Sequence, residues 1–347
     1  MSPAKRSAKK SAQPFKDRDF ARDFHRMMVR VRVLEERLIK MVRTGDGFFW
    51  IGGPGEEAFN VALGLLVNKG HGPAHDYLHL HYRNNGALLA MGAPMIDSIR
   101  QMKNSEKDPF SGGRNFVAHV CRKEWNVVPA TSPIETQYSI APGTAWVQRA
   151  YRKEHGESGI TIVVGGDAGS AEGDFATCMI WSSRPKQEVP VLMIVTNNGY
   201  GISTPGNTQH GERHVADRGK PFGIETNVAD GNSPEKVWEA LQDAMDYVRT
   251  KGKPYLLELK VSRLYGHSSS SGSNRIDEMC PVDSFEKKLL KQGWLTKADV
   301  AKVWESAQAE ATAALEEVRG ESYPAASTVH DHTFANNERG GIPGRDI

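Results

Sequence analysis

Two short apolar runs, residues 160–164 and 189–195, constrain the fold more than any other feature of the chain. Both are rich in β-branched residues and almost wholly apolar, which is typical of strands buried on both faces of a sheet. The segment between them, residues 169–183, has helix-compatible residues with apolar side chains at Phe175, Met179 and Ile180. We therefore predict a strand–helix–strand unit and an α/β fold, with a mostly parallel sheet flanked by helices.

Polar residues follow both predicted strands at the point where each ends. Gly165, Gly166 and Asp167 follow the first run, and Asn198 follows the second. Open parallel sheets bind ligands at the carboxyl ends of their strands, so Asp167 and Asn198 should converge there. One anionic and one neutral oxygen suit magnesium, and glycines followed by a helix suit a phosphate. The sequence predicts a magnesium–diphosphate site.

Two other interpretations fit parts of this segment. Asp167 can simply cap the following helix, and residues 197–199 can be an ordinary turn. A nicotinamide site fits less well, because the glycines do not follow G-x-G-x-x-G. The second strand also ends in Thr196 and Asn197, where an acid that binds ribose would be needed.

Length and composition favour one large α/β domain, residues 17–320, although two smaller domains also fit 347 residues. Residues 1–16 carry five positive charges and no acid, and we interpret them as a disordered basic tail rather than a transit peptide. Residues 321–347 form a C-terminal tail. A net charge of +2 gives no reason to expect nucleic acid, and no apolar run is long enough to span a membrane. Three cysteines without a C-x-x-C pair indicate a reducing cytoplasm.

Apolar periodicity predicts further helices and a second strand–helix–strand unit. The expected helices are 17–43, 56–67, 284–290 and 296–318, the last with a capping box between Thr296 and Asp299. The second unit has a short strand ending near residue 232, a helix at 233–251 and a strand at 255–261. Residues 105–128 are polar and rich in glycine, and should form a long loop over the site.

Histidines suggest two different sites. His75 and His79 have the i, i+4 spacing of a helical metal pair, which keeps a zinc hydrolase open, but the H-E-x-x-H glutamate is absent. His267 follows the 255–261 strand in a loop rich in serine and glycine, where it can donate or accept a proton near neutral pH. It can equally be an exposed loop histidine without a catalytic role.

The segment from Gly165 to Gly199 resembles the thiamin diphosphate motif in the alpha subunit of the decarboxylating component of 2-oxoacid dehydrogenase complexes. Ala168 stands where that motif usually has glycine. The runs G-E-E-A at 55–58, Tyr-Arg at 82–83, T-S-P-I-E-T-Q at 131–137 and Gly-His-Ser at 266–268 resemble the same family, closest to its branched-chain type. The resemblance implies a thiamin diphosphate-binding α/β fold.

The resemblance also implies roles for individual residues. His267 is the catalytic residue, and Phe49 lines the acyl pocket. Magnesium is bound by the side chains of Asp167 and Asn198 and by the carbonyl of Tyr200. The cofactor contacts are Tyr82, Arg83, Ser132, Ile134, Gly166, Asp167, Ala168, Gly169, Asn198, Tyr200 and His267. A structural potassium ion is bound by Thr131, Pro133, Thr136 and Gln137.

The implied activity is oxidative decarboxylation of a 2-oxoacid with transfer of the acyl group to a lipoyl arm. A branched-chain substrate is preferred, with pyruvate or acetoin as alternatives. The implied partners are a beta subunit, in a heterotetramer of two alpha and two beta subunits, and a lipoyl-bearing acyltransferase. The beta subunit supplies the glutamate that activates the cofactor, in the cytoplasm or, in a eukaryote, the mitochondrial matrix. Ala168 and the altered loop 269–275 keep open a catalytically silent scaffolding paralogue.

Overall fold

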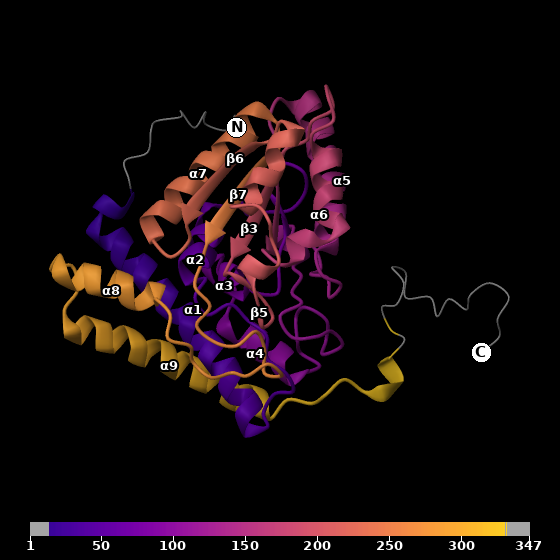
Figure 1. Cartoon of the computed structure of the whole chain (residues 1–347). Coiled ribbons are helices and arrows are strands. Elements are labelled where there is room, and N and C mark those ends of the chain that lie inside the picture. The colour runs from indigo at the N-terminus through magenta and orange to yellow at the C-terminus, as the bar shows by residue number, and fades with distance from the viewer. Residues whose placement is uncertain (1–13, 330, 332–347) are drawn as a thin grey trace, which may run out of the picture.

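A five-stranded sheet in which every strand is parallel to its neighbours forms the centre of the computed structural model, which describes residues 14–329 and 331 (Figure 1). In spatial order the strands are β1 (Tyr77–His79), β2 (Thr161–Gly166), β3 (Val191–Asn197), β7 (Tyr255–Lys260) and β6 (Glu225–Asp230). The predicted α/β class with a mostly parallel sheet is confirmed.

The predicted central unit is present as β2, α6 (Gly173–Ser182) and β3. Val164 pairs with Ile194 and Gly166 with Thr196, so the two strands end side by side. The helix begins later than expected, because a 3-10 turn, η3 (Gly169–Ala171), precedes it. The second predicted unit is also confirmed, as β6, α7 (Pro234–Lys251) and β7.

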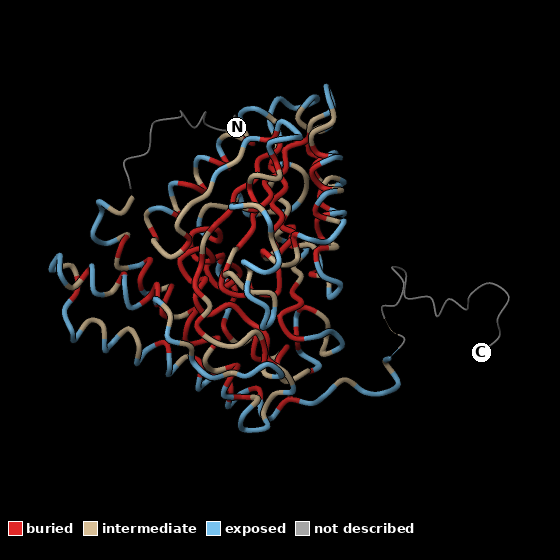
Figure 2. Tube along the Cα trace, viewed as in Figure 1, coloured by how far each residue is buried: buried red, intermediate tan, exposed pale blue. Residues whose placement is uncertain are grey.

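Side chains alternate along the buried strands and divide the core into two layers. Val163 and Val195 face one layer, with α5 (Thr136–His155) and α6. Ile162 and Ile194 face the other layer, with α7, α2 (Glu57–Leu66) and α1 (Arg18–Thr44). Figure 1 shows α5 and α6 on one side of the sheet and α7 on the other, and Figure 2 shows that the buried positions concentrate along the strands between them. This double covering explains why β2 and β3 are continuously apolar.

The long helix α1 has the ends that its sequence predicts. Asp17 caps its first turn by accepting a hydrogen bond from Asp19 N (2.8 Å), and Gly45 ends it in the left-handed conformation (φ 79°). It packs against α8 (Pro281–Lys291) and α9 (Lys297–Arg319). The predicted capping box of Thr296 and Asp299 is present at the start of α9.

Several elements were not predicted from the sequence. The largest, α5, contains Pro142 and Gly143, which weaken any helical signal, but it buries Tyr138, Ala141 and Ala145 against the sheet. The other unpredicted elements are β1, α3 (Asn85–Ala90), α4 (Met95–Lys103), η2 (Lys123–Trp125), the hairpin of β4 (Tyr200–Gly201) and β5 (Thr204–Pro205), η4 (Gly206–Thr208), η5 (Val215–Phe222) and η6 (Ala326–Thr328).

The folded region extends beyond the expected domain limits of 17 and 320. Residues 14–16 form a 3-10 turn, η1 (Pro14–Lys16), in which Phe15 packs edge-on against Phe24 with ring centroids 5.0 Å apart. At the other end Glu321 pairs with Arg100 (2.8 Å). Residues 1–13, 330 and 332–347 of the two expected tails lie outside the described residues. Within residues 14–329 and 331, none of the helices combines the length and apolarity needed to cross a bilayer.

Candidate cofactor and active site

The carboxyl ends of β2 and β3 bring Asp167 and Asn198 to the same edge of the sheet, as predicted. Asp167 is 2% exposed and its Oδ2 makes no hydrogen bond. Burial raises the pKa of this carboxyl above its usual value, because the charged form loses hydration. A cation would supply the missing partner. Magnesium fits this position because it prefers oxygen ligands and completes its shell with water and phosphate.

Asn198 is held in a tight turn directly after β3. Its Oδ1 accepts a hydrogen bond from Tyr200 N (3.1 Å), and Asn197 Oδ1 accepts one from Gly199 N (3.0 Å). Gly199 has φ 76°, a conformation that glycine adopts without strain. Asn197 is fixed in turn by donating from Nδ2 to Glu258 Oε1 (2.7 Å) on β7. These bonds set the direction of the Asn198 side chain and of the Tyr200 backbone.

The turn after β2 leaves room for a ligand. A Cβ added at Gly166 would meet no atom within 4 Å, so a phosphate can reach the backbone there. Ala168 stands where the motif usually has glycine, but its methyl group does not obstruct this space. The methyl group lies beside Gly201, since a Cβ added at Gly201 would be only 2.7 Å from it. The methyl group is therefore directed at the β4 backbone.

Arg83 is a buried guanidinium at the centre of the site. Its Nη2 donates to Tyr82 Oη (3.0 Å), and its Nη1 donates to Gly52 O (3.2 Å). Its Nε is buried, makes no hydrogen bond, and lies 3.7 Å from Glu56 Oε1. Arg83 lowers the pKa of the Asp167 carboxyl by its charge, which places both groups in one electrostatic environment. A buried cation with a free donor beside an unpartnered acid fits a diphosphate bound together with a metal ion.

His267 lies against this guanidinium. Arg83 Nη2 approaches His267 Nδ1 at 3.4 Å, and the Tyr82 ring packs edge-on against the imidazole (5.9 Å between centroids). Burial, and then the charges of Arg83 and Arg263, lower the pKa of His267 to about 4. The imidazole is therefore neutral near pH 7. With Nδ1 facing a donor, its proton is carried on Nε2.

The loop after His267, which departs from the family sequence, is anchored within the chain. Ser269 N donates to Trp50 O (2.8 Å), and Trp50 N donates to Ser269 Oγ (3.1 Å). Arg43, at the end of α1, donates from Nη2 to Ser273 O (2.6 Å). These contacts order the segment.

The 131–137 run lies beside the turn that carries Asp167. Ser132 Oγ hydrogen-bonds His119 Nε2 (2.9 Å), and Ile134 is exposed on the surface. Thr131 Oγ1 donates to Gln137 Oε1 (3.2 Å) and contacts Pro133 O (3.4 Å). Thr136 N also donates to Pro133 O (3.4 Å), so the four residues predicted to bind potassium gather around one turn.

Phe116 and His119 connect Phe49 to the 131–137 run. The Phe49 ring is 4.9 Å from Phe116, which is 5.6 Å from the His119 ring. Phe116 and His119 come from the long loop predicted to cover the site. Sequence reasoning did not single out either residue, because no local spacing connects them to Phe49 or Ser132.

Buried carboxyl groups around the site were also missed. Burial raises the pKa of Glu56 and of Glu135 to about 8, so both groups hold a proton near neutral pH. Glu135 Oε1 accepts a hydrogen bond from Gly166 N (3.0 Å). Glu56 was visible in the sequence as part of G-E-E-A, but its burial beside Arg83 was not. Glu135 was visible only as a polar residue in a turn.

The loop at 202–222 contacts the turn that follows Asp167. Arg218 Nη1 donates to Ser170 O (2.6 Å), and its Nη2 pairs with Glu212 Oε1 (2.5 Å). Arg218 therefore lies beside the turn after Asp167. Its guanidinium is already engaged by protein groups.

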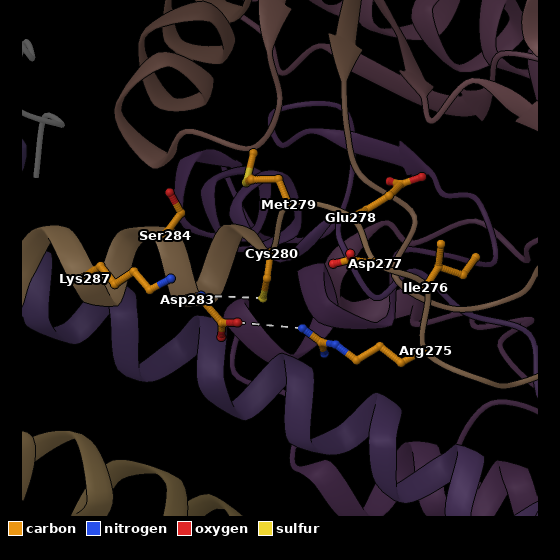
Figure 3. A pocket seen from close by; sticks show the side chains of 9 residues that line it. All are labelled: Arg275, Ile276, Asp277, Glu278, Met279, Cys280, Asp283, Ser284 and Lys287. Atoms are coloured by element: carbon orange, nitrogen blue, oxygen red, sulfur yellow. Dashed lines mark hydrogen bonds and ion pairs between the residues drawn. The ribbon is translucent and has the colours of Figure 1, made fainter.

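Two surface hollows lie apart from these residues. One, of about 570 Å³, is lined by residues 275–280, 283, 284 and 287, where Arg275 pairs with Asp283 at 3.7 Å (Figure 3). The other, of about 580 Å³, lies between α5 and α6 and includes Trp146 and Trp181. Neither is lined by a residue predicted to bind cofactor or metal.

The histidine cluster does not have the geometry that a zinc hydrolase requires. His79 is in β1 and His75 is in the turn before it, so their spacing is not that of a helical pair. His79 Nε2 instead hydrogen-bonds Thr144 Oγ1 (2.9 Å). Among residues 14–329 and 331, no group of three or more His, Cys, Asp or Glu side chains is placed to hold a metal ion.

The chain is similar to known proteins over most of its length. The chain matches the dehydrogenase E1 component family over residues 25–327. It is 28% identical to the 2-oxoisovalerate dehydrogenase subunit alpha of Bacillus subtilis over 322 residues, which cover 90% of this chain and 94% of that protein. It is 28% identical to the mitochondrial protein of that name from Caenorhabditis elegans over 295 residues, 82% of this chain and 66% of that one. For the subunit alpha 1 protein of Arabidopsis thaliana the identity is 27% over 302 residues, 84% of this chain and 61% of that one.

The chain thus spans nearly all of the bacterial relative but less than two thirds of the plant one. The family match covers most of the chain and includes Arg83, Asp167, Asn198 and His267. These residues lie at the carboxyl edge of the sheet. The chain therefore belongs to the dehydrogenase E1 component family.

Proposed function

We propose that this chain is the alpha subunit of a thiamin diphosphate-dependent 2-oxoacid dehydrogenase that acts on branched-chain 2-oxoacids. The observation that carries the proposal is the meeting of Arg83, Asp167 and His267, which are far apart in sequence. They provide a phosphate-binding guanidinium, an oxygen for a cation and a neutral imidazole. The names of the relatives, 2-oxoisovalerate dehydrogenase subunit alpha, support the branched-chain choice over pyruvate or acetoin.

In this proposal Tyr82 and Arg83 bind the diphosphate, and Ser132 and Ile134 contact the rest of the cofactor. The backbone of residues 166–169 approaches the phosphates. Magnesium is held by the side chains of Asp167 and Asn198 and by the Tyr200 carbonyl, and the unpartnered Asp167 Oδ2 supports that assignment. The oxygens of Thr131, Pro133, Thr136 and Gln137 hold potassium.

Thiamin diphosphate, when bound, supplies the carbon nucleophile and the electron sink that decarboxylation of a 2-oxoacid requires. His267 then acts as the hydrogen-bond donor of this chain at the reacting group. Because its pKa is lowered to about 4, it reaches the reaction neutral, and its Nε2–H can donate a hydrogen bond that stabilises negative charge developing on the substrate or on the acyl acceptor. Phe49 and Phe116 form an apolar wall against which a branched acyl chain can pack.

The name of the relatives as alpha subunits supports a beta subunit as partner. We propose a heterotetramer of two alpha and two beta subunits, in which the beta subunit supplies the acid that activates the cofactor. The acyl group then passes to a lipoyl-bearing acyltransferase. His267 lies at the start of an anchored surface loop, which is a suitable place for the lipoyl arm to enter.

The test is native mass spectrometry of the tagged chain purified from its own cells, followed by assays with 2-oxoisovalerate, pyruvate and acetoin. We expect an alpha–beta heterotetramer that carries thiamin diphosphate and magnesium and prefers 2-oxoisovalerate. The His267→Gln variant should keep the assembly and its cofactor while losing acyl transfer. A cofactor-free assembly with no activity would instead show a silent scaffolding paralogue.

A further inference from the structure

Glu135 adopts a conformation and a position that its place in the sequence does not explain. It precedes α5, yet its side chain does not cap that helix. Its backbone is left-handed (φ 64°), which is costly for a residue with a Cβ, and its side chain is only 1% exposed. A strained, buried acid persists when surrounding contacts hold it in place.

Two glycines make room for this carboxyl group. A Cβ at Gly165 would lie 2.1 Å from Glu135 Oε2, and a Cβ at Gly169 would lie 2.1 Å from Glu135 Oε1. The ring of Tyr138 closes the same space, since its Cε2 would lie 2.6 Å from a Cβ at Gly165. The carboxyl group therefore fills a cavity beneath the turn that joins β2 to the Asp167 backbone.

The carboxyl group makes one specific contact with that turn. Glu135 Oε1 accepts a hydrogen bond from Gly166 N (3.0 Å), the amide directly before Asp167. A buried amide needs an acceptor, and this bond fixes the peptide plane between Gly165 and Gly166. Asp167 Oδ2 has no partner in the chain, and the backbone hydrogen bonds to this carboxyl come from Asp167 and Ala168 of the same turn. The direction of the Asp167 side chain therefore depends on the backbone of the turn that begins at Gly166.

We propose that Glu135 is a positioning residue that couples the 131–137 turn to the 165–169 turn and so aligns Asp167 for the magnesium–diphosphate group. This inference rests on the proposed function, because it assumes that the group bound there is thiamin diphosphate with magnesium. Glu135 aligns Asp167 through its acceptor oxygen and not through its charge. Glutamine at this position keeps an acceptor at the same distance.

The chain offers a matched control at the other end of the same strand. Asp76 is equally buried and its Oδ1 accepts a hydrogen bond from Ile160 N (3.0 Å), directly before β2. It also pairs with Arg249 (2.6 Å), far from the carboxyl edge of the sheet. Asp76→Ala should therefore lower stability without altering the site, which separates a positioning effect from a general loss of stability.

The experiment is calorimetric titration of thiamin diphosphate, in excess magnesium, into the cofactor-free complex of this chain with its beta subunit. We expect Glu135→Ala to raise the dissociation constant about tenfold or more, as loss of a residue that orients a metal ligand does. Glu135→Gln should stay within about threefold of wild type, and so should Asp76→Ala despite a lower melting temperature. Glu135→Asp, shorter by one methylene, should fall between the two, and it replaces Glu135→Ala if that variant does not assemble.

Three results would overturn the inference while leaving the proposed function intact. These are an unchanged dissociation constant in Glu135→Ala and Glu135→Asp, an equal rise in Asp76→Ala, or a rise in Glu135→Gln as large as in Glu135→Ala. A wild-type complex that binds no thiamin diphosphate would overturn the proposed function and the inference together.

Discussion

The methyl group of Ala168 occupies the space that a side chain at position 201 would need. A Cβ on Gly201 would lie 2.7 Å from Ala168 Cβ, well inside the normal contact distance between carbon atoms. Position 201 follows Tyr200, whose carbonyl is the proposed magnesium ligand. The two turns that carry the proposed metal ligands therefore contact each other here, and alanine at 168 is accommodated because residue 201 is glycine.

This contact predicts strong coupling between the two positions. Gly201→Ala should lower the free energy of unfolding by about 1 to 3 kcal/mol, because added volume in a tightly packed turn forces the backbone to shift. Ala168→Gly alone should have a small effect. The double variant Ala168→Gly/Gly201→Ala should recover only part of the loss, because a Cβ at position 201 would also lie 2.6 Å from Gln209 Oε1, although that side-chain end can move. Denaturant unfolding of all four proteins gives the coupling energy. Additive effects would show that the two groups do not interfere.

The neutral state of His267 gives a second prediction. Burial and the charges of Arg83 and Arg263 lower its pKa to about 4, so Arg83→Gln should raise the pKa toward 6.5 by removing one of the two cations. Titration of ¹³C-labelled histidine signals in the cofactor-free complex measures this, with His267→Gln identifying the signal. A wild-type pKa near 6.5, unchanged in Arg83→Gln, would contradict the proximity of the two groups. Loss of the imidazole should slow acyl transfer by about a hundredfold or more.

The aromatic pair of Phe49 and Phe116 predicts substrate selectivity. Phe49→Ala should enlarge the acyl site and raise the ratio of kcat/KM for longer over shorter 2-oxoacids by about tenfold, the usual effect of one or two methylene groups in an apolar pocket. Phe48→Ala is the control, because Phe48 is 64% exposed and packs on Tyr323 instead. Equal ratios in both variants would place the substrate elsewhere.

Buried His79 predicts a loss of stability in mild acid. Burial lowers its pKa from 6.5 in the unfolded chain to about 4. Below pH 6.5 the His79 side chain binds a proton in the unfolded state but stays neutral in the folded state until the pH nears 4. The contribution of neutral His79 to stability is therefore fully present above pH 6.5 and is lost as the pH falls toward 4. At about pH 5.5 this single group costs about 1.4 kcal/mol.

His79→Gln can retain a polar contact with Thr144 and should reduce that acid loss. The measurement is the midpoint of denaturant unfolding as a function of pH for both proteins. His155→Gln, at the exposed end of α5, controls for removing a histidine. A slope unchanged by His79→Gln would mean that other buried groups dominate the acid response.

The sequence predicted the elements that have strong local signals. Continuous apolar runs identified β2, β3 and β7, and apolar periodicity identified α1, α7 and α9, because these elements bury faces that their own residues define. It did not predict α5, whose Pro142 and Gly143 oppose a helix that packing against the sheet nevertheless stabilises. The secondary structure of such a segment depends on tertiary contacts, which a local sequence pattern does not reveal.

The residues of the candidate site also divide into those with a local sequence signal and those that only the tertiary structure reveals. Asp167 and Asn198 were predicted from chemistry, because each directly follows a recognisable strand. His267 was also singled out from its chemistry and its place after a strand, and the family resemblance added its catalytic role. Arg83 was found through the resemblance, and the 3.4 Å approach of the two residues needed the structure. Glu135 and His119 were missed because their relevance depends on contacts with Gly166 and Ser132 that no sequence spacing indicates.

The order of the strands also has a consequence for biosynthesis. β6 has β7 as its strand partner in the sheet, although β7 is made after it, and β7 lies between β6 and β3. During translation, β3 and β6 therefore leave the ribosome with unpaired edges and must wait for residues 255–260 before the sheet can close. Exposed edges of this kind favour aggregation, so we expect the nascent chain to depend on chaperones until that segment emerges.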